Sequence, residues 1–310
     1  MSLDKYKGLL WGAALGDAIG APYECKHGSL SYKDEIVESA SLPLGSITDD
    51  TEMIIALGRA LVENKGIWIK ENVVIEYCKW ASGDPADIGI NTKMLFRHIT
   101  MYPQKYNKMY DATYKAYILD KPQKYWSQSN GCLMRCSILA LCKNDSKNKE
   151  VWVEDCKLSN PHPVCIEACE LYSRCIEGLV SCDYTVIDNY RSFNSCINDV
   201  VQSVLRREKR DVSNNRGWVC HGLYFALWMY KWNDFDTFED GMKWVIGEHL
   251  DSDTDTNACI AGSILGMKLG FEKMIRSSVT KKNYEIVLRC KTSRPYKAEE
   301  INKFIEILTK

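Results

Sequence analysis

Apolar side chains along this chain recur mostly at the three- and four-residue spacing that is typical of helices. The period predicts helices over most of the chain: 3–20, 50–64, 70–81, 130–142, 163–180, 186–206, 217–231, 236–249, 257–270 and 296–309. The alternating pattern of a strand is clearest at 284–290 (YEIVLRC), and that segment is short. Because no repeat or clean linker divides the chain, we expect one compact all-α domain over residues 1–310.

Two of the predicted helices carry glycine at every fourth position. These glycines are Gly8, Gly12, Gly16 and Gly20 in the first helix, and Gly262, Gly266 and Gly270 in the second. A glycine inside a helix costs up to about 1 kcal/mol relative to alanine, so a row of them needs a structural reason. Close packing against another helix backbone is such a reason, and we expect both rows in one crowded core, where they can face each other. The alternative, glycines that break the helices into loops, is disfavoured by the unbroken apolar residues between them.

The charged residues nearly balance, with 41 acidic and 40 basic side chains and a net charge of −1. Together with 45% hydrophobic residues, this excludes a long disordered chain and a strongly basic nucleic-acid-binding domain. The basic run at 206–210 is interrupted by Glu208 and is expected to be a solvated helix end. Two polar stretches, 102–128 and 143–150, are predicted as exposed loops, with a lid or an insertion as the alternative for the first.

The fourteen cysteines form no Cys-x-x-Cys motif, and the closest pairs, Cys132/Cys136 and Cys165/Cys169, are one helical turn apart. Zinc sites usually have tighter pairs, so we expect reduced thiols that are mostly buried as small core side chains. The chain has no run of about 18 apolar residues that would predict a membrane span. It also has no basic segment followed by the apolar core of a signal peptide. We therefore expect an intracellular, cytoplasmic protein, and a monomer.

Two short acidic clusters each begin a predicted helix, at 48–51 (TDDT) and at 251–256 (DSDTDT). Taken singly, each is explained by helix capping, because Asp and Thr accept hydrogen bonds from the first N–H groups of a helix. A cap needs one acceptor, however, whereas these clusters provide several carboxylates and hydroxyls. If the two helix starts converge, their crowded charges need a cation, and ligands that are all oxygen select Mg²⁺, Mn²⁺ or Ca²⁺.

Several further short motifs accompany these clusters. In chain order the set is 12–24 (GAALGDAIGAPYE), 48–51 (TDDT), 87–89 (DIG), 130–135 (NGCLMR), 162–163 (HP), 217–219 (GWV) and 253–257 (DTDTN). In this ordered series the chain resembles the ADP-ribosylglycohydrolases, a family that removes ADP-ribose from modified proteins. The resemblance covers residues 4–270 and leaves 271–310 as a C-terminal extension. It implies a compact all-α fold, which agrees with the helical period.

The resemblance also implies a centre of two divalent metal ions, Mg²⁺ or Mn²⁺, between the two acidic clusters. Its ligands are expected to be Thr48, Asp49, Asp50, Asp253, Asp255 and Thr256. Asp50 is expected to act in catalysis as well, with Glu24 beside the metals and Asp87 near the reacting ribose as candidate acids or bases. From the residues alone, Glu24 can also be a solvated loop carboxylate and Asp87 a helix cap.

For the substrate, the resemblance assigns Asn130, Gly131 and Cys132 to a loop on the phosphate side, where glycine and a helix N-terminus favour an anion. His162 is expected to face the diphosphate or the ribose, and Trp218 to stack on the ligand. The alternative for both is a structural role, since most single histidines and tryptophans belong to the fold.

The resemblance therefore implies a metal-dependent hydrolase that cleaves the glycosidic bond between ADP-ribose and a protein side chain or small conjugate. Two features depart from the family pattern. Asp251 and Ser252 replace glycines, and Cys132 replaces a commoner serine. A catalytically inactive ADP-ribose-binding or structural protein on the same fold is therefore the alternative. A phosphohydrolase with His-Asp ligands is disfavoured, because the chain has no His-Asp dipeptide.

Overall fold

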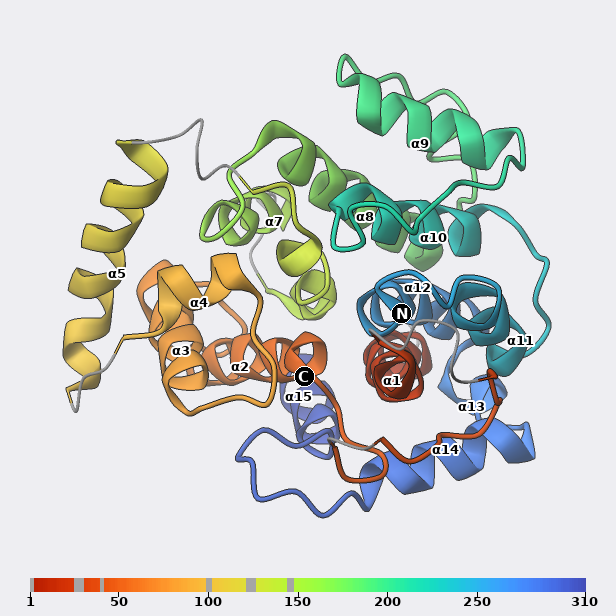
Figure 1. Cartoon of the computed structure of the whole chain (residues 1–310), viewed down its shortest axis with the longest axis horizontal. Coiled ribbons are helices and arrows are strands. Elements are labelled where there is room, and N and C mark those ends of the chain that lie inside the picture. The colour runs from red at the N-terminus through yellow and green to blue at the C-terminus, as the bar shows by residue number, and fades with distance from the viewer. Residues whose placement is uncertain (1–2, 25–30, 40–41, 99–101, 121–126, 144–147) are drawn as a thin grey trace.

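The structure is a computed structural model that describes residues 3–24, 31–39, 42–98, 102–120, 127–143 and 148–310 (Figure 1). Cys25 and residues 121–126 and 144–147 of the two polar stretches lie outside the described residues.

The described chain is built from helices, and its only β-type pairing is an isolated bridge between Ser129 and Trp218. The α-helices are α1 (Leu3–Gly20), α2 (Asp49–Glu63), α3 (Lys70–Ser82), α4 (Ile90–Phe96), α5 (Tyr106–Tyr114), α7 (Asn148–Lys157), α8 (Pro163–Ser181), α9 (Ser195–Leu205), α10 (Val219–Lys231), α11 (Phe238–Met242), α12 (Thr254–Leu269), α13 (Phe271–Met274), α14 (Ser278–Leu288) and α15 (Glu300–Leu308). Short 3₁₀ or π turns are η1 (Ala21–Tyr23), η2 (Pro103–Lys105), η3 (Lys115–Leu119), η4 (Asn130–Cys132), η5 (Cys136–Leu141) and η6 (Lys243–Gly247). The expected all-α class is confirmed.

Several local predictions need correction. The segment 284–290 is not a strand, because it lies mostly in α14. The helix predicted over 186–206 begins only at Ser195, where the side chain of Asn194 caps it. The helix predicted over 130–142 consists of η4 and η5, with the Arg135 side chain donating to the carbonyl of Gly131.

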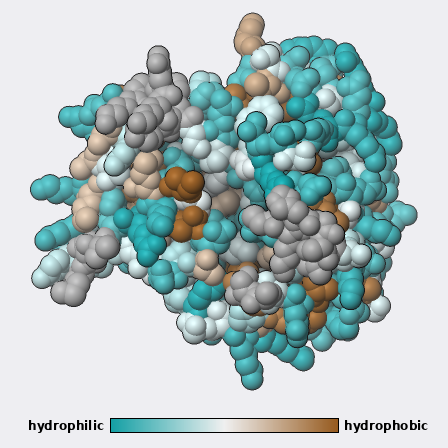
Figure 2. Space-filling view, in the orientation of Figure 1, coloured by the Kyte–Doolittle hydropathy of each residue, from teal (hydrophilic) through white to brown (hydrophobic). Residues whose placement is uncertain are grey.

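The two polar stretches contain helices that the apolar period did not predict. The first stretch holds α5, and the second continues into α7. On the face of the molecule in Figure 2, hydrophilic side chains dominate and hydrophobic ones gather in small separate groups. None of the helices in the described ranges combines the length and the apolar character that crossing a membrane requires.

Helices α1 and α12 lie side by side at the centre of the molecule (Figure 1). All residues from 8 to 20 of α1 are buried, as expected for a helix that other helices surround. The two helices run antiparallel, and a Cβ on Gly12 would lie 2.1 Å from the carbonyl oxygen of Gly262. The two glycine rows therefore do face each other, because only glycine permits backbones to approach this closely.

The other helices surround this central pair. Helix α10 packs against α12, and α13, α14 and α15 contact α1. Helix α2 leads into α3, α4 and α5, which form one side of the molecule (Figure 1). The C-terminal end of α1, the start of α2 and the start of α12 thereby lie close together, and this is where the acidic clusters are.

Candidate functional site

Three buried carboxylates from three helices meet at this junction. Asp17 lies in the last turns of α1, Asp50 in the first turn of α2 and Asp255 in the first turn of α12. Each offers a carboxylate oxygen within 4.8 Å of the others. The two acidic clusters therefore converge, as the sequence analysis required. Asp17 is a third partner that the sequence analysis did not assign, although a single carboxylate within the apolar and glycine-rich residues 8–20 is a signal for it.

Asp17 holds the start of α2 in place. Its carboxylate accepts hydrogen bonds from the backbone N–H of Thr48 at 3.0 Å and of Thr51 at 3.1 Å, and from the Thr48 hydroxyl at 2.8 Å. The first N–H groups of a helix have no partner within the helix, so this carboxylate takes the place of a local cap. The hydroxyl of Thr48 also lies 2.9 Å from the carboxylate of Asp50.

A second group of carboxylates adjoins the first and shares Asp255. Glu24, directly after η1, and Asp253, just before α12, each offer an oxygen within 4.8 Å of Asp255. The Thr256 hydroxyl lies 3.4 Å from Asp50, on the side of the first group. Two adjacent sets of oxygen donors therefore have one residue in common.

The charges at this junction oppose one another strongly. Burial, followed by repulsion from Asp49, Asp17 and Asp253, raises the pKa of Asp50 well above its usual value. Burial, followed by repulsion from Asp50, Asp253 and Glu24, does the same to the pKa of Asp255. Such shifts mean that the ionised carboxylates need a compensating positive charge at this position.

The donor set fits a hard divalent cation. Within the described residues, Oδ1 of Asp50 is buried and accepts no hydrogen bond. The single proton of the Thr48 hydroxyl cannot serve Asp17 and Asp50 at once, although both carboxylates lie within 2.9 Å of it. A buried oxygen that accepts no hydrogen bond destabilises the folded state. A cation that binds oxygen would provide a partner for Oδ1 of Asp50 and for the carboxylate that the Thr48 proton does not serve.

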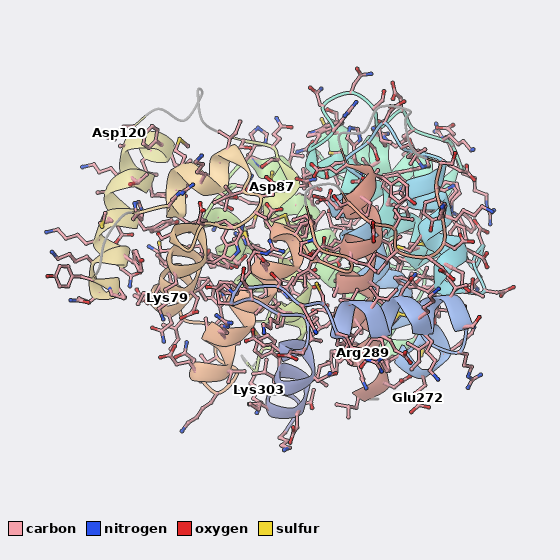
Figure 3. All side chains as sticks on the ribbon, turned by 60° about the horizontal axis from the view of Figure 1, so that its bottom comes forward. Lys79, Asp87, Asp120, Glu272, Arg289 and Lys303 are labelled. Carbon is pink, nitrogen blue, oxygen red and sulfur yellow. The ribbon has the colours of Figure 1, made fainter. Side chains whose placement is uncertain are left out.

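The carboxylates border a cleft of about 380 Å³. Eight of the residues predicted for the site line it: Glu24, Asp49, Asp87, Asn130, Gly131, Asp253, Asp255 and Thr256. Asp87 is exposed on the loop between α3 and α4 (Figure 3). Thr48 and Asp50 are buried and do not belong to the lining. The lining also includes Thr92, which lies outside the sequence motifs, and Met134, which lies in the 130–135 motif but was not assigned to the site.

One wall of the cleft is held by pairing between residues 128–130 and 217–219. The N–H of Asn130 donates to the carbonyl of Gly217 at 2.8 Å, and the N–H of Val219 donates to the carbonyl of Gln128 at 2.9 Å. The side-chain amide of Asn130 donates to Asp253 at 2.8 Å. Asn130 therefore couples this wall to the acidic centre and fixes the orientation of Asp253.

His162 and Trp218 lie behind the same wall and do not line the cleft. The Trp218 indole N–H donates to Oε1 of Gln128 at 2.9 Å, and Nε2 of the same amide lies 3.3 Å from Nε2 of His162. Nδ1 of His162 accepts from the N–H of Val164 and caps α8. Burial lowers the pKa of His162, which agrees with a neutral ring that accepts at Nδ1. In this structure both side chains support the wall.

The positions that depart from the family pattern also point away from the cleft. Cys132 is fully buried, and its thiol donates to the carbonyl of Ser129. Ser252 is buried beside the first turn of α12, where its hydroxyl accepts from the side-chain amide of Asn257 at 3.4 Å. Neither these two residues nor Asp251 line the cleft.

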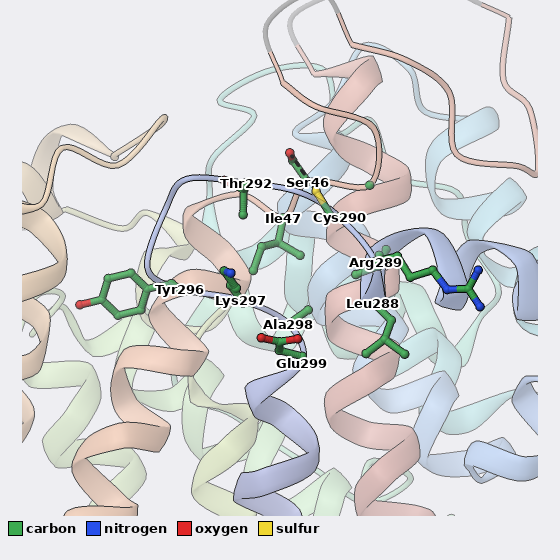
Figure 4. Close-up of a pocket in the computed structure, with 12 residues that line it drawn as sticks. Ser46, Ile47, Leu288, Arg289, Cys290, Thr292, Tyr296, Lys297, Ala298 and Glu299 are labelled. Carbon is green, nitrogen blue, oxygen red and sulfur yellow. Dashed lines mark hydrogen bonds between the residues drawn. The ribbon is translucent and has the colours of Figure 1, made fainter.

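A second cavity, of about 230 Å³, lies between residues 45–47 and the segment 287–299 (Figure 4). The same C-terminal segment contacts the start of α2 directly. Arg294 donates to the carbonyl of Ile47 at 2.7 Å and forms an ion pair with the buried Glu52 at 3.0 Å. These contacts flank Thr48 and Asp50, so residues after 270 help to position the acidic centre.

Comparisons with known proteins relate this chain to a family and a fold. The profile of the ADP-ribosylglycohydrolase family matches residues 1–295. The ADP-ribosyl-[dinitrogen reductase] glycohydrolase of Rhodospirillum rubrum is 26% identical over 282 residues, which cover 87% of each chain. The ADP-ribosylarginine hydrolase Tri1 of Pseudomonas putida (strain GB-1) is 23% identical over 287 residues, which cover 88% of this chain and 72% of the relative. A solved ADP-ribosylglycohydrolase-related protein complex contains a chain similar in fold, with a TM-score of 0.74 and 20% identity, covering 99% of this chain and 97% of that one.

The family match extends beyond residue 270 and includes α14, in agreement with the contacts of Arg294. The likeness to the solved structure supports the all-α fold, and the relatives' names agree with the expected enzyme class, a hydrolase of glycosidic bonds. With the motifs in order, the acidic clusters brought together and the profile matched over residues 1–295, this chain belongs to the ADP-ribosylglycohydrolase family.

Proposed function

We propose that this protein is a metal-dependent hydrolase that releases ADP-ribose from a modified protein side chain or a small ADP-ribose conjugate. The observation that carries the proposal is the meeting of Asp17, Asp50 and Asp255 beside a cleft, where Oδ1 of Asp50 is buried and accepts no hydrogen bond from any described residue. The names of the relatives point first to proteins as acceptors, and to arginine as the first linkage to test.

We propose that two ions, Mg²⁺ or Mn²⁺, occupy the two adjacent sets of oxygen donors. The first set consists of Asp17, Thr48, Asp50 and Thr256, and the second consists of Glu24 and Asp253. Asp255 belongs to both sets. The hard oxygen donors favour these ions over Zn²⁺. Bound divalent ions would supply Lewis-acid chemistry, by polarising oxygen atoms of the substrate and lowering the pKa of water.

Among the protein's own groups, Glu24 is the best placed to move a proton. It lines the cleft, is partly exposed and lies beside Asp253 and Asp255. Asp87 also lines the cleft and is more exposed, which suits a second carboxylate that contacts the substrate. Asp50 is buried, so its proposed role is to bind metal and not to transfer a proton. Two carboxylates that flank a sugar bond are the usual arrangement for glycosidic hydrolysis.

The cleft also needs neutral or positive partners for a negatively charged diphosphate. Gly131 and Gly217 line it, and a Cβ on either would meet no atom closer than 3.6 Å, so their backbones are accessible from the cleft. The backbone at these two glycines can therefore approach phosphate oxygens, whereas the N–H groups of Asn130 and Val219 are used in the pairing of the wall. His162 and Trp218 act here by holding Gln128, and not by direct contact.

The test is release of ADP-ribose from a panel of defined linkages, beginning with ADP-ribosyl-arginine, in Mg²⁺, in Mn²⁺ and in chelator. We expect release from at least one linkage with metal, loss of release with chelator, and loss in the Asp255→Asn variant. Asp211→Asn is the matched control, because Asp211 is an exposed carboxylate outside the cleft. Tight ADP-ribose binding without release from any linkage would replace the hydrolase with the alternative, an inactive binding protein.

A further inference from the structure

Three buried cysteines from separate parts of the chain meet behind the cleft wall. They are Cys132 of η4, Cys156 of α7 and Cys169 of α8. Their sulfur atoms all lie within 4.8 Å of one another, and the exposed fraction of each residue is at most 1%. Sequence spacing did not indicate this cluster, because its members come from three elements and not from a paired motif.

Two further thiols border the cluster. The Cys165 side chain interacts with Cys132, and the Cys136 side chain interacts with Cys169. The Cys165 thiol also points to the carbonyls of Ser127 and Ser129, which lie 3.6 and 3.8 Å from its sulfur. The spacing of one turn within each pair, Cys132/Cys136 and Cys165/Cys169, places both members of the pair on one side of their helical segment.

The separation of the sulfur atoms suits a bound metal ion. Metal–thiolate bonds of about 2.3 Å place three ligands around one ion at roughly 4 Å from one another, or slightly closer in a tetrahedral site. The limit of 4.8 Å for the three sulfur atoms is compatible with this geometry after small rotamer adjustments. Thiolate sulfur is a soft ligand and selects Zn²⁺ or Cu⁺ over the hard ions that fit the acidic centre.

A buried ion pair lies beside the cluster. Arg135 is fully buried, pairs with Asp155 and donates to the carbonyl of Gly131. Its guanidinium also interacts electrostatically with Cys132. Arg135 therefore links the cluster to Gly131, which lines the cleft.

We propose that Cys132, Cys156 and Cys169 form a binding site for one thiophilic metal ion, Zn²⁺ or Cu⁺, with Cys165, which interacts with Cys132, as an additional ligand. The ion replaces the thiol protons, which leave to solvent, and no electron transfer is involved. The site is separate from the acidic centre in position and in ligand chemistry, so it does not depend on the proposed hydrolase activity.

The function of such an ion would be structural. It would join η4 to α7 and α8, three segments that no backbone pairing links at this point. Gly131, which precedes Cys132, lines the cleft. The bound ion would therefore stiffen the wall of the cleft from behind, and its removal would lower the stability of this part of the fold first.

The experiment uses the full chain, reduced and refolded in the presence of Cd²⁺, which serves as a spectroscopic probe for a Zn²⁺ site. Only sulfur ligands give the thiolate-to-metal absorption band in the ultraviolet, so binding to the acidic centre does not interfere. We expect a band that saturates at one equivalent of Cd²⁺, and that is lost in Cys169→Ala and in Cys156→Ser. Cu⁺ titration of the metal-free protein, with a chelator competing for the ion, distinguishes copper from zinc.

Cys175→Ala is the matched control, because Cys175 is equally buried in α8 but lies outside the cluster. It should keep the full band. Circular dichroism shows whether each variant is folded, and Cys156→Ser decides the outcome if Cys169→Ala is not. A wild-type chain with neither a Cd²⁺ band nor Cu⁺ binding, or a Cys175→Ala variant that loses the band as the cluster variants do, would overturn the proposal in favour of simple thiol packing.

Discussion

The carboxylate of Asp17 accepts hydrogen bonds from both the backbone N–H and the hydroxyl of Thr48, which joins the end of α1 to the start of α2. The same carboxylate lies within reach of Asp50 and Asp255, where a metal would bind. One side chain therefore performs two tasks, since it caps a helix through N–H groups and also contributes charge to the acidic centre.

Replacing Asp17 with asparagine should weaken both tasks, because the amide presents N–H groups where the carboxylate accepted them. Hydrogen bonds to charged groups contribute about 1.5–3 kcal/mol, so we expect Asp17→Asn to lower the free energy of unfolding by roughly that amount. Chemical denaturation measures this loss, and Mn²⁺ titration should show weaker binding. Asp4→Asn is the control, because Asp4 accepts from the N–H of Glu272 at the far end of α1. If the Mn²⁺ affinity of Asp17→Asn were unchanged, Asp17 would cap α2 without contributing to metal binding.

Asp255→Asn should raise the free energy of unfolding of the metal-free protein and lower it, relative to the wild type, when metal is bound. Without metal, Asp255 is repelled by Asp50, Asp253 and Glu24, so the neutral amide removes an unfavourable charge. We therefore expect the free energy of unfolding of the metal-free variant to exceed that of the metal-free wild type. Saturating Mn²⁺ should stabilise the wild type and not the variant, which reverses the order. Thermal unfolding with Mn²⁺ and with chelator tests this, and an order that metal does not alter would argue against Asp255 as a ligand.

A methyl group on Gly12 should separate the two central helices. The added Cβ would lie 2.1 Å from the backbone oxygen of Gly262, which cannot move without its helix. We expect Gly12→Ala to cost about 3 kcal/mol or more, which outweighs the gain of about 1 kcal/mol in helix propensity. In Gly241→Ala the Cβ would meet side-chain atoms of Leu265 and Met229 and no backbone atom, and the ends of side chains can move more easily than a helix backbone. Comparable losses in the two variants, measured by urea denaturation, would contradict this account of the α1–α12 contact.

Lys268 predicts a pH dependence of stability in the alkaline range. It lies in the last turn of α12 and donates to the carbonyls of Met229, Tyr230 and Trp232 at 2.7–3.1 Å. Burial nevertheless lowers its pKa from 10.5 to about 8. Between these two pH values the unfolded lysine still holds a proton that the folded one has released, so stability attributable to this group rises with pH.

The comparison with Lys268→Met isolates this effect. The difference in free energy of unfolding between the wild type and the variant should increase in favour of the wild type from pH 8 to pH 10.5. Lys273→Met removes an exposed ammonium group from α13 and is the control. The difference in free energy of unfolding between the wild type and this variant should not change with pH. Urea denaturation at several pH values gives both curves. A difference that falls with pH would mean that the three carbonyls keep the folded lysine charged.

The central helix pair and the meeting of the acidic clusters could be predicted from the sequence, because both leave local signals. Glycine at every fourth position is too costly to occur without close packing, and more carboxylates than a cap requires indicate a cation.

The segment 284–290 was wrongly predicted as a strand for a physical reason. The buried face of α14 contains the polar Thr280 and Asn283, so the helical period of its apolar residues is incomplete.

Other parts of the site depend on contacts between distant segments and leave no local pattern. The side chain of Gln128 contacts both His162 and Trp218, and Trp218 lies 90 positions away in the sequence. The hydrogen bond from Arg294 to the carbonyl of Ile47 spans 247 positions. The cysteine cluster likewise draws on three elements, and no spacing within one of them reveals it.

The glycine rows also raise a question of alignment. Gly8 faces Gly266 and Gly12 faces Gly262, and a slip of four residues, about 6 Å, would place Gly12 opposite Gly266 and Gly16 opposite Gly262. The four-residue spacing therefore does not by itself define one register. Polar contacts at both ends of the pair distinguish the observed register. Thr254 donates to the carbonyl of Gly20 at 3.0 Å beside the acidic centre, and Asp4 accepts from the N–H of Glu272 at the opposite end. A slip of one turn would break both contacts and would move Asp255 away from Asp17 and Asp50.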